Sequence, residues 1–179
     1  MKITVFAFLC IAIIFFVVPG CFPSKKQAAD KEFKNGDSWI PPGFRPQNSI
    51  LLIQLLDVDA APKRWQDKLS KWNQEMQDYM KEKYPYPYEF VNEDQIENPA
   101  KKFSDHSKYG FGLLISKGSK RYEGVAGKQV GDKFYNTATV YDFYFIDRAT
   151  GKKFPLNKKY SSNPVMTFMP VINTILAKK

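Results

Sequence analysis

Apolar and polar positions between residues 49 and 83 predict a buried strand followed by a covering helix. Ser49–Leu56 holds six apolar residues in eight and is too short for a typical helix, which predicts a central strand buried on both faces. Pro62 then stands at a first-turn position of a helix that ends near Lys83. One side of that helix carries an apolar stripe of Trp65, Leu69, Trp72, Met76 and Tyr79. A stripe of this kind is typical of a helix that covers a sheet.

Prolines shape the segment that follows the helix. Tyr84–Val91 contains Pro85 and Pro87. Each proline favours an extended conformation in the residue before it, and it lacks the N–H that a strand needs for pairing on both sides. The segment therefore predicts a connection that enters a short edge strand. Asn92–Lys102 is polar and contains a proline, which predicts a short helix and a loop.

Glycines and alternating apolar residues mark the strands of the second half. Tyr109–Ser116 predicts a strand with Gly110 and Gly112 on one face. The flat patch that these glycines leave is expected to receive a bulky side chain from the covering helix, Trp65 or Trp72; a bound ligand that approaches the backbone is the alternative.

The remaining segments complete an α+β outline. Lys117–Phe134 contains four glycines and predicts a basic hairpin, and Tyr135–Asp147 predicts a long strand. Asp147–Lys152 predicts a tight turn with glycine where φ is positive. Asn163-Pro164 predicts the capped start of a last helix. The order of elements predicts an α+β fold, with a mixed, mainly antiparallel sheet and helices packed on one face, in one compact domain.

The first residues of the chain form an apolar segment that precedes this domain. Lys2 is followed by the 20 uncharged residues of Ile3–Phe22, which is typical of an export signal. The segment runs into Val18-Pro19-Gly20-Cys21, which resembles the lipobox of bacterial lipoproteins, although Pro19 departs from the usual small or hydroxyl residue. The resemblance implies that residues 1–20 are a signal peptide and that Cys21 carries the lipid as the first residue of the mature chain.

Two alternatives to the lipoprotein interpretation stay open. Ile3–Phe22 is long enough to cross the roughly 30 Å hydrocarbon layer as a single uncleaved anchor. The pair Pro19-Gly20 argues against that anchor because it breaks a helix. The lysines that follow the apolar segment outnumber Lys2 before it, which reverses the usual topological charge bias and counts against the lipoprotein interpretation. The other alternative is ordinary secretion, which would leave Cys21 as a lone free thiol.

Residues 21–48 read as a lipidated cysteine and flexible tether before a domain at residues 49–179. Few side chains of the tether are suited to burial, but Trp39, Ile40 and Phe44 provide an alternative in which part of it docks on the domain as a strap. No acidic cluster follows Cys21. The lipoprotein resemblance therefore implies an outer-membrane position facing the periplasm.

Composition narrows the partners and the chemistry. The chain carries 27 basic and 18 acidic residues, for a net charge of +9, and loss of Lys2 with the signal peptide would leave +8. A basic domain in the envelope favours an anionic envelope component or an acidic protein as partner, and the predicted location disfavours nucleic acid. His106 is the one histidine, which excludes a multi-histidine metal site. No cofactor motif is found, and Cys10 would be lost with the signal peptide.

Three groups of residues are candidates for binding. Lys63 and Arg64 occupy the first turn of the predicted helix, where an anion is favoured, and Asp57 and Asp59 nearby offer a purely structural explanation. The basic hairpin contributes Lys117, Lys120, Arg121 and Lys128, which are suited to an acidic partner, to the lipid head groups close to the anchor, or simply to solvent. Tyr84, Tyr86 and Tyr88 alternate along an extended segment and are suited either to an aromatic platform or to packing over the helix end.

These features favour a lipid-anchored envelope protein with a binding or scaffold domain over an enzyme. An envelope polymer hydrolase is the first alternative, and an inhibitor or immunity protein that plugs a partner's site is the second. A hydrolase predicts a concave pocket in which His106 or two carboxylates converge. A binding domain predicts a flat, basic or aromatic face.

Overall fold

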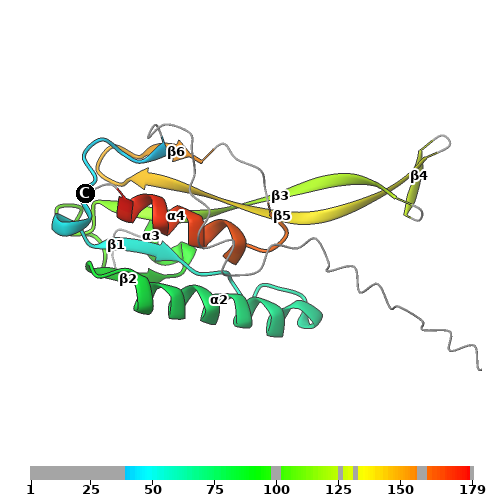
Figure 1. Ribbon diagram of the computed structural model, residues 1–179, viewed down its shortest axis with the longest axis horizontal. Coiled ribbons are helices and arrows are strands. Elements are labelled where there is room, and N and C mark those ends of the chain that lie inside the picture. Colours follow the sequence, from blue (N-terminus) through cyan, green and yellow to red (C-terminus); the bar gives the residue numbers. More distant parts are fainter. Residues whose placement is uncertain (1–38, 98–101, 125–126, 131–132, 157–160, 178–179) are drawn as a thin grey trace, which may run out of the picture.

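The computed structural model describes residues 39–97, 102–124, 127–130, 133–156 and 161–177 (Figure 1). The predicted signal peptide, the lipid attachment at Cys21 and most of the predicted tether lie outside these residues. None of the helices among the described residues is long and apolar enough to cross a membrane.

A six-stranded mixed sheet forms the centre of the domain. Its order is β2-β1-β3-β5-β4, with β6 also paired to β5. The strands are β1 (Leu51–Gln54), β2 (Tyr88–Val91), β3 (Phe111–Gly124), β4 (Lys128–Val130), β5 (Lys133–Asp147) and β6 (Lys152–Pro155). β1 is parallel to β2 and β3, and the other pairs are antiparallel. The α+β fold with a mixed, mainly antiparallel sheet is confirmed, and so are the central strand and the edge strand.

The two long helices cover one face of the sheet. They are α2 (Lys63–Lys83) and α4 (Val165–Ala177), and Figure 1 shows both on the same side of β1 and β3. Odd-numbered residues of β3 and β5, such as Leu113 and Phe143, point into the core beneath them. The hydroxyl of Tyr79 in α2 donates a hydrogen bond of 2.5 Å to the side-chain oxygen of Asn173 in α4.

A smaller core lies on the opposite face of the sheet. It contains Leu52, Val91, Ile96, Phe103, Tyr109 and Leu114. Ile96 comes from the short helix α3 (Glu93–Glu97), and Phe103 and Tyr109 come from the segment between α3 and β3. The sheet is therefore covered on both faces, by the long helices on one and by α3 with its following segment on the other.

The folded domain begins earlier than the predicted boundary at residue 49. Trp39, Ile40 and Phe44 are buried with 3%, 4% and 4% of their surface exposed. The Phe44 ring lies 5.1 Å from the ring of Phe145 in β5, and a 3-10 turn, η2 (Pro46–Asn48), leads into β1. Residues 39–48 therefore dock on the domain as a strap, because their aromatic and apolar side chains complete the core.

α2 begins and ends near the expected residues, but its apolar stripe is shorter than expected. Leu69, Trp72, Met76 and Tyr79 are buried, whereas Trp65 is 42% exposed because it lies before the part of the helix that meets the sheet. Asn73 holds the chain after β1 against the helix. Its amide nitrogen donates to the Leu56 carbonyl and its oxygen accepts from the Leu56 N–H, each at 2.9 Å.

The expectation that Trp65 or Trp72 packs against the glycines of β3 is wrong. A side chain at Gly112 would meet Leu114 at 2.8 Å and Ile146 at 3.1 Å, and both of these side chains belong to the face away from the long helices. Gly112 lies on that face because it shares the even-numbered register with Leu114.

The predicted basic hairpin at 117–134 is part of a longer structure. β3 continues through Gly124 and pairs with β5 along its whole length, from Phe111 opposite Asp147 to Gly124 opposite Phe134. The predicted turn after β5 is confirmed, with Gly151 at a φ of 69°. The cap of the last helix is confirmed as well, because the side-chain oxygen of Asn163 accepts a 3.0 Å hydrogen bond from the Val165 N–H.

Candidate functional site

The distal part of β3 and β5 forms a two-stranded ribbon that extends well beyond the body of the domain (Figure 1). β1 pairs with β3 only from Phe111 to Leu113, whereas β3 continues to Gly124. At 3.3 Å per residue, the stretch from Ser116 to Gly124 is about 30 Å long, and its first pairs still lie over the body, because Val140 and Tyr141 in the facing strand are buried. We call this part of β3, together with the facing part of β5 and with β4, the ribbon.

Strand register sorts the charged residues of the ribbon onto its two sides. Lys117 pairs with Tyr141 and Arg121 with Thr137, so these two basic residues share the side that carries odd-numbered positions. Lys128 pairs with Tyr135 and Val130 with Lys133 on the same side. We call Lys117, Arg121, Lys128 and Lys133 the basic face. Lys120 pairs with Ala138 and lies on the other side.

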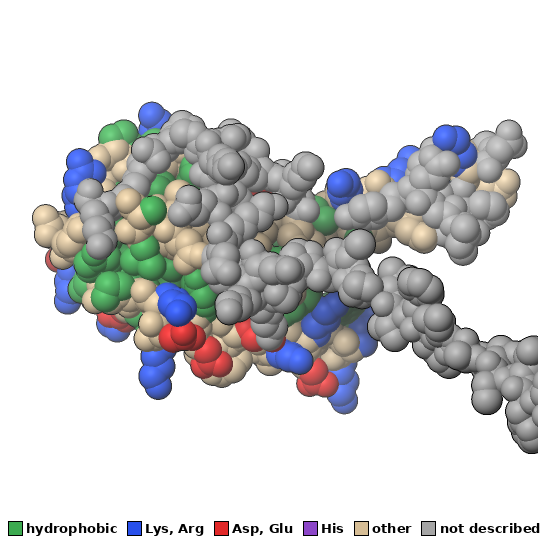
Figure 2. Space-filling model, in the orientation of Figure 1, with side chains coloured by type: hydrophobic (Ala, Val, Ile, Leu, Met, Phe, Trp, Pro, Cys, Tyr) green, Lys and Arg blue, Asp and Glu red, His purple; other side chains and the backbone are tan. Residues whose placement is uncertain are grey.

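The basic face is exposed, and Glu123, opposite Tyr135, is the one acidic residue of β3 whose register places it on the same side. All four of its basic residues are exposed, and so is Val130, at 48%. Figure 2 shows Lys and Arg along the ribbon, whereas over α2 the basic and acidic side chains alternate. Basic residues therefore predominate along the ribbon, whereas α2 carries six basic and four acidic residues in mixed order.

The ribbon also presents strand edges. Beyond Leu113, no strand lies beside the outer edge of β3 in the part of the chain that the structure describes. The main-chain donors and acceptors of that edge are suited to a strand of another chain.

Lys63 and Arg64 are exposed in the first turn of α2, as predicted. Within the described residues, neither forms an ion pair with Asp57 or Asp59, and Asp57 instead accepts a 3.0 Å hydrogen bond from the Ala60 N–H. The N-terminal end of α2 lies at the end of the body from which the ribbon emerges (Figure 1).

The three tyrosines after α2 do not form a flat exposed platform. Tyr84 is only 4% exposed, and its ring meets Tyr86 at 83° and Tyr88 at 76°. Tyr86 and Tyr88 are half-buried against the main core. Burial, with a smaller contribution from Tyr86, raises the pKa of the Tyr84 hydroxyl. These rings pack over the helix end, which is the structural alternative given above.

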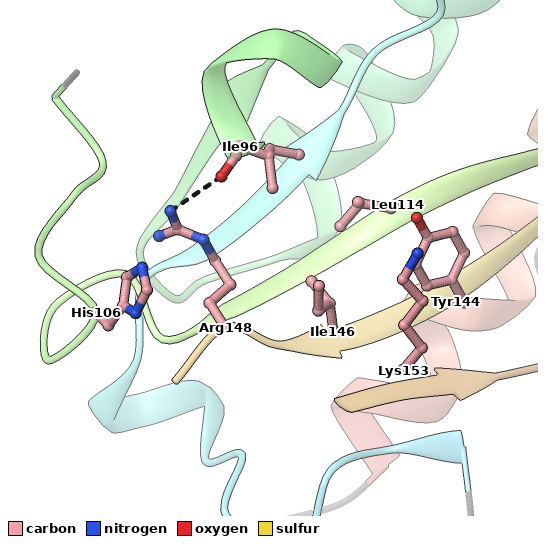
Figure 3. A pocket seen from close by; sticks show the side chains of 7 residues that line it. All are labelled: Ile96, His106, Leu114, Tyr144, Ile146, Arg148 and Lys153. Carbon is pink, nitrogen blue, oxygen red and sulfur yellow. Dashed lines mark hydrogen bonds between the residues drawn. The ribbon is translucent and has the colours of Figure 1, made fainter. Parts of the chain in front are cut away.

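A pocket of about 310 Å³ lies on the face of the sheet opposite the long helices (Figure 3). Its lining comes from five parts of the chain: Ile96, His106, Leu114, Tyr144, Ile146, Arg148 and Lys153. Sequence reasoning singled out only His106 among them. Arg148 follows the end of β5 in a stretch that the sequence marks as a turn, and no local pattern indicates its burial.

The pocket holds His106 but not the other groups that a hydrolase needs. No carboxylate lines it, and no serine, threonine or cysteine side chain does. Two acidic side chains elsewhere in the domain have partners of their own: Glu89 pairs with Lys102, and Glu93 accepts a hydrogen bond from Gln54. The described residues contain no cluster of side chains suited to a metal ion. The pocket thus presents the positive charges of Arg148 and Lys153 beside an apolar surface.

Comparison with known proteins finds a likeness to solved structures only. No family model matches the chain, and no curated protein matches it. One solved structure, described as "putative neuraminyllactose-binding hemagglutinin homolog" from Helicobacter pylori, is 9% identical and covers 82% of this chain and 88% of its own, with a TM-score of 0.37. A TM-score of this size does not assign the two proteins to one fold.

Proposed function

We propose that this protein is a lipid-anchored envelope protein whose domain docks on an acidic protein through the basic face of the ribbon. The observation that supports this most is a paired, basic extension that contributes little to the core. Isolated two-stranded ribbons are marginally stable in water. Most side chains of the ribbon are exposed, including Lys117, Arg121 and Lys133, so burial within this chain does not account for its length.

An acidic protein fits the ribbon better than a membrane surface does. Val130 adds an exposed apolar contact within the basic face, and the open edge of β3 offers main-chain hydrogen bonds that lipid head groups cannot match in register. Positive charge steers an acidic partner toward the ribbon and opposes basic ones.

The lipid anchor is the second part of the proposal. Processing at Cys21 would place the domain at the outer membrane, facing the periplasm, on a short tether that ends at the docked residues 39–48. Intact mass and membrane fractionation of the wild type beside Cys21→Ala test this. We expect a membrane-bound wild type with the mass of residues 21–179 plus lipid, and an unprocessed variant. A wild type that keeps residues 1–20 would instead support the single-span anchor through Ile3–Phe22.

Site-specific photocrosslinking in the cells that make the protein tests the docking surface. A photoreactive amino acid replaces Ser119 on the side of the basic face or, as a matched control, Ser70 on the outer surface of α2; both serines are exposed. We expect a discrete protein adduct from position 119 and not from position 70. Equal adducts from both positions, or lipid adducts alone from position 119, would contradict docking of a protein on the ribbon.

A further inference from the structure

Arg148 is a buried cation at one end of the pocket. Its side chain is 8% exposed, and its guanidinium donates to the carbonyls of Phe103 and Tyr109, each at 2.7 Å, and to that of Ile96 at 3.2 Å. These bonds use three of the five N–H donors of a guanidinium. These neutral carbonyls fix the orientation of the guanidinium but do not neutralise its charge.

No carboxylate among the described side chains pairs with Arg148. A buried charge without a counterion is unfavourable, and the same desolvation lowers the pKa of the Arg148 guanidinium. An anion that enters the pocket would supply the missing charge and accept the remaining N–H donors. A carboxylate matches the planar fork of a guanidinium.

The rest of the pocket has an apolar floor and a second cation. In Figure 3, Leu114 and Ile146 lie between the Arg148 side chain and Lys153. The Lys153 ammonium lies 5.3 Å from the centre of the Tyr144 ring. Because no acidic side chain lines the pocket, its field favours an anion, and because its floor is apolar, it favours an anion with an apolar body.

We propose that this pocket binds a small carboxylate with an apolar body, whose carboxylate faces Arg148 and whose body lies on Leu114 and Ile146. The volume of about 310 Å³ is at the small end of the roughly 300–1,000 Å³ range of ligand pockets. Lys153 at the exposed end strengthens binding through its charge. The site is separate from the ribbon, so its ligand does not depend on the proposed protein partner.

Methyl NMR of the purified full-length chain in detergent tests the proposal. Isoleucine δ1 methyls are labelled with ¹³C, because Ile96 and Ile146 line the pocket, whereas Ile172 and Ile175 are buried in the core on the other face of the sheet and serve as internal controls. The probes are benzoate, the neutral benzamide and inorganic phosphate, each titrated to about 10 mM.

We expect benzoate to shift Ile96 and Ile146 saturably, with little effect on Ile172 and Ile175, and benzamide and phosphate to bind at least about tenfold more weakly. Lys153→Glu should weaken benzoate binding by about threefold or more. Lys152→Glu is the matched control, because neighbouring residues of β6 point to opposite faces, and it should leave the affinity unchanged.

Three results would overturn the proposal. Equal shifts with benzamide would show that the pocket recognises apolar bulk and not charge. Equal effects of the two lysine variants would show that benzoate responds to net charge alone. The absence of any saturable shift would show that Arg148 serves only to hold the backbone around it.

Discussion

Replacing Arg148 by methionine removes the guanidinium and keeps most of the apolar stem. In the folded protein, Arg148 joins β5 to the segments on the second face of the sheet through the carbonyls of Ile96, Phe103 and Tyr109. Its main-chain N–H also donates to the Gly110 carbonyl at 2.8 Å. The substitution leaves that main-chain bond and removes the other three.

The size of the effect follows from two opposing contributions. Each buried carbonyl that loses its donor costs about 1–3 kcal/mol, and the neighbouring residues 104–108 are exposed, so water offsets part of this cost. Removing the buried cation also removes its desolvation penalty, which offsets a further part of the cost. We therefore expect Arg148→Met to lower the free energy of unfolding by about 2–4 kcal/mol and Tm by roughly 5–15 °C.

Urea unfolding followed by circular dichroism, beside a thermal scan, measures this loss. Lys152→Met is the control, because Lys152 is exposed on β6 and its loss should change the free energy of unfolding by no more than about 0.5 kcal/mol. If Arg148→Met were as stable as this control, the three hydrogen bonds would contribute no more than the burial of the charge costs, and the reasoning would be refuted.

Four further substitutions test other contacts by the same measurement. Tyr84→Phe should raise the free energy of unfolding by up to about 1 kcal/mol, because the buried hydroxyl has no described partner, whereas Tyr79→Phe loses a hydrogen bond and should lower it by about 1 kcal/mol. In the folded state, burial raises the pKa of the Tyr84 hydroxyl above its ordinary value of 10.0. The stability of the wild type should therefore be complete below about pH 10 and fall as pH rises further, and Tyr84→Phe should reduce that fall. Asn73→Ala leaves the N–H and carbonyl of Leu56 without their partner and should cost about 2–5 kcal/mol. Gly151→Ala forces a side chain into a positive φ and should cost about 1 kcal/mol; an unchanged Tm would contradict the role of that turn.

The sequence was sufficient for elements whose pattern is local. The apolar run at 51–54 predicts β1, the spacing from Leu69 to Tyr79 predicts the buried side of α2, and Asn163-Pro164 predicts the start of α4. In each case a few neighbouring residues determine the structure, through burial on both faces of a strand, one face of a helix or a single side-chain cap.

Features that depend on distant partners were not accessible in the same way. The continuation of β3 through Gly124 depends on its pairing with β5, and the glycines at 118 and 124 read as turn signals when taken alone. The burial of Arg148 depends on carbonyls that are 39 to 52 residues away in the chain. The docking of Trp39 and Phe44 likewise requires a core that lies elsewhere in the sequence.

The most direct test of docking through the ribbon is the yield of the position-119 adduct in two charge-reversed variants. Lys117→Glu with Arg121→Glu reverses two charges on the basic face, and Lys71→Glu with Lys81→Glu reverses two exposed charges on α2. Because the net charge changes equally, only the location differs between the two variants. We expect the ribbon variant to lose most of the adduct, by about tenfold, and the α2 variant to keep it. Equal losses in both variants, or an undiminished adduct in the ribbon variant, would contradict docking through the basic face.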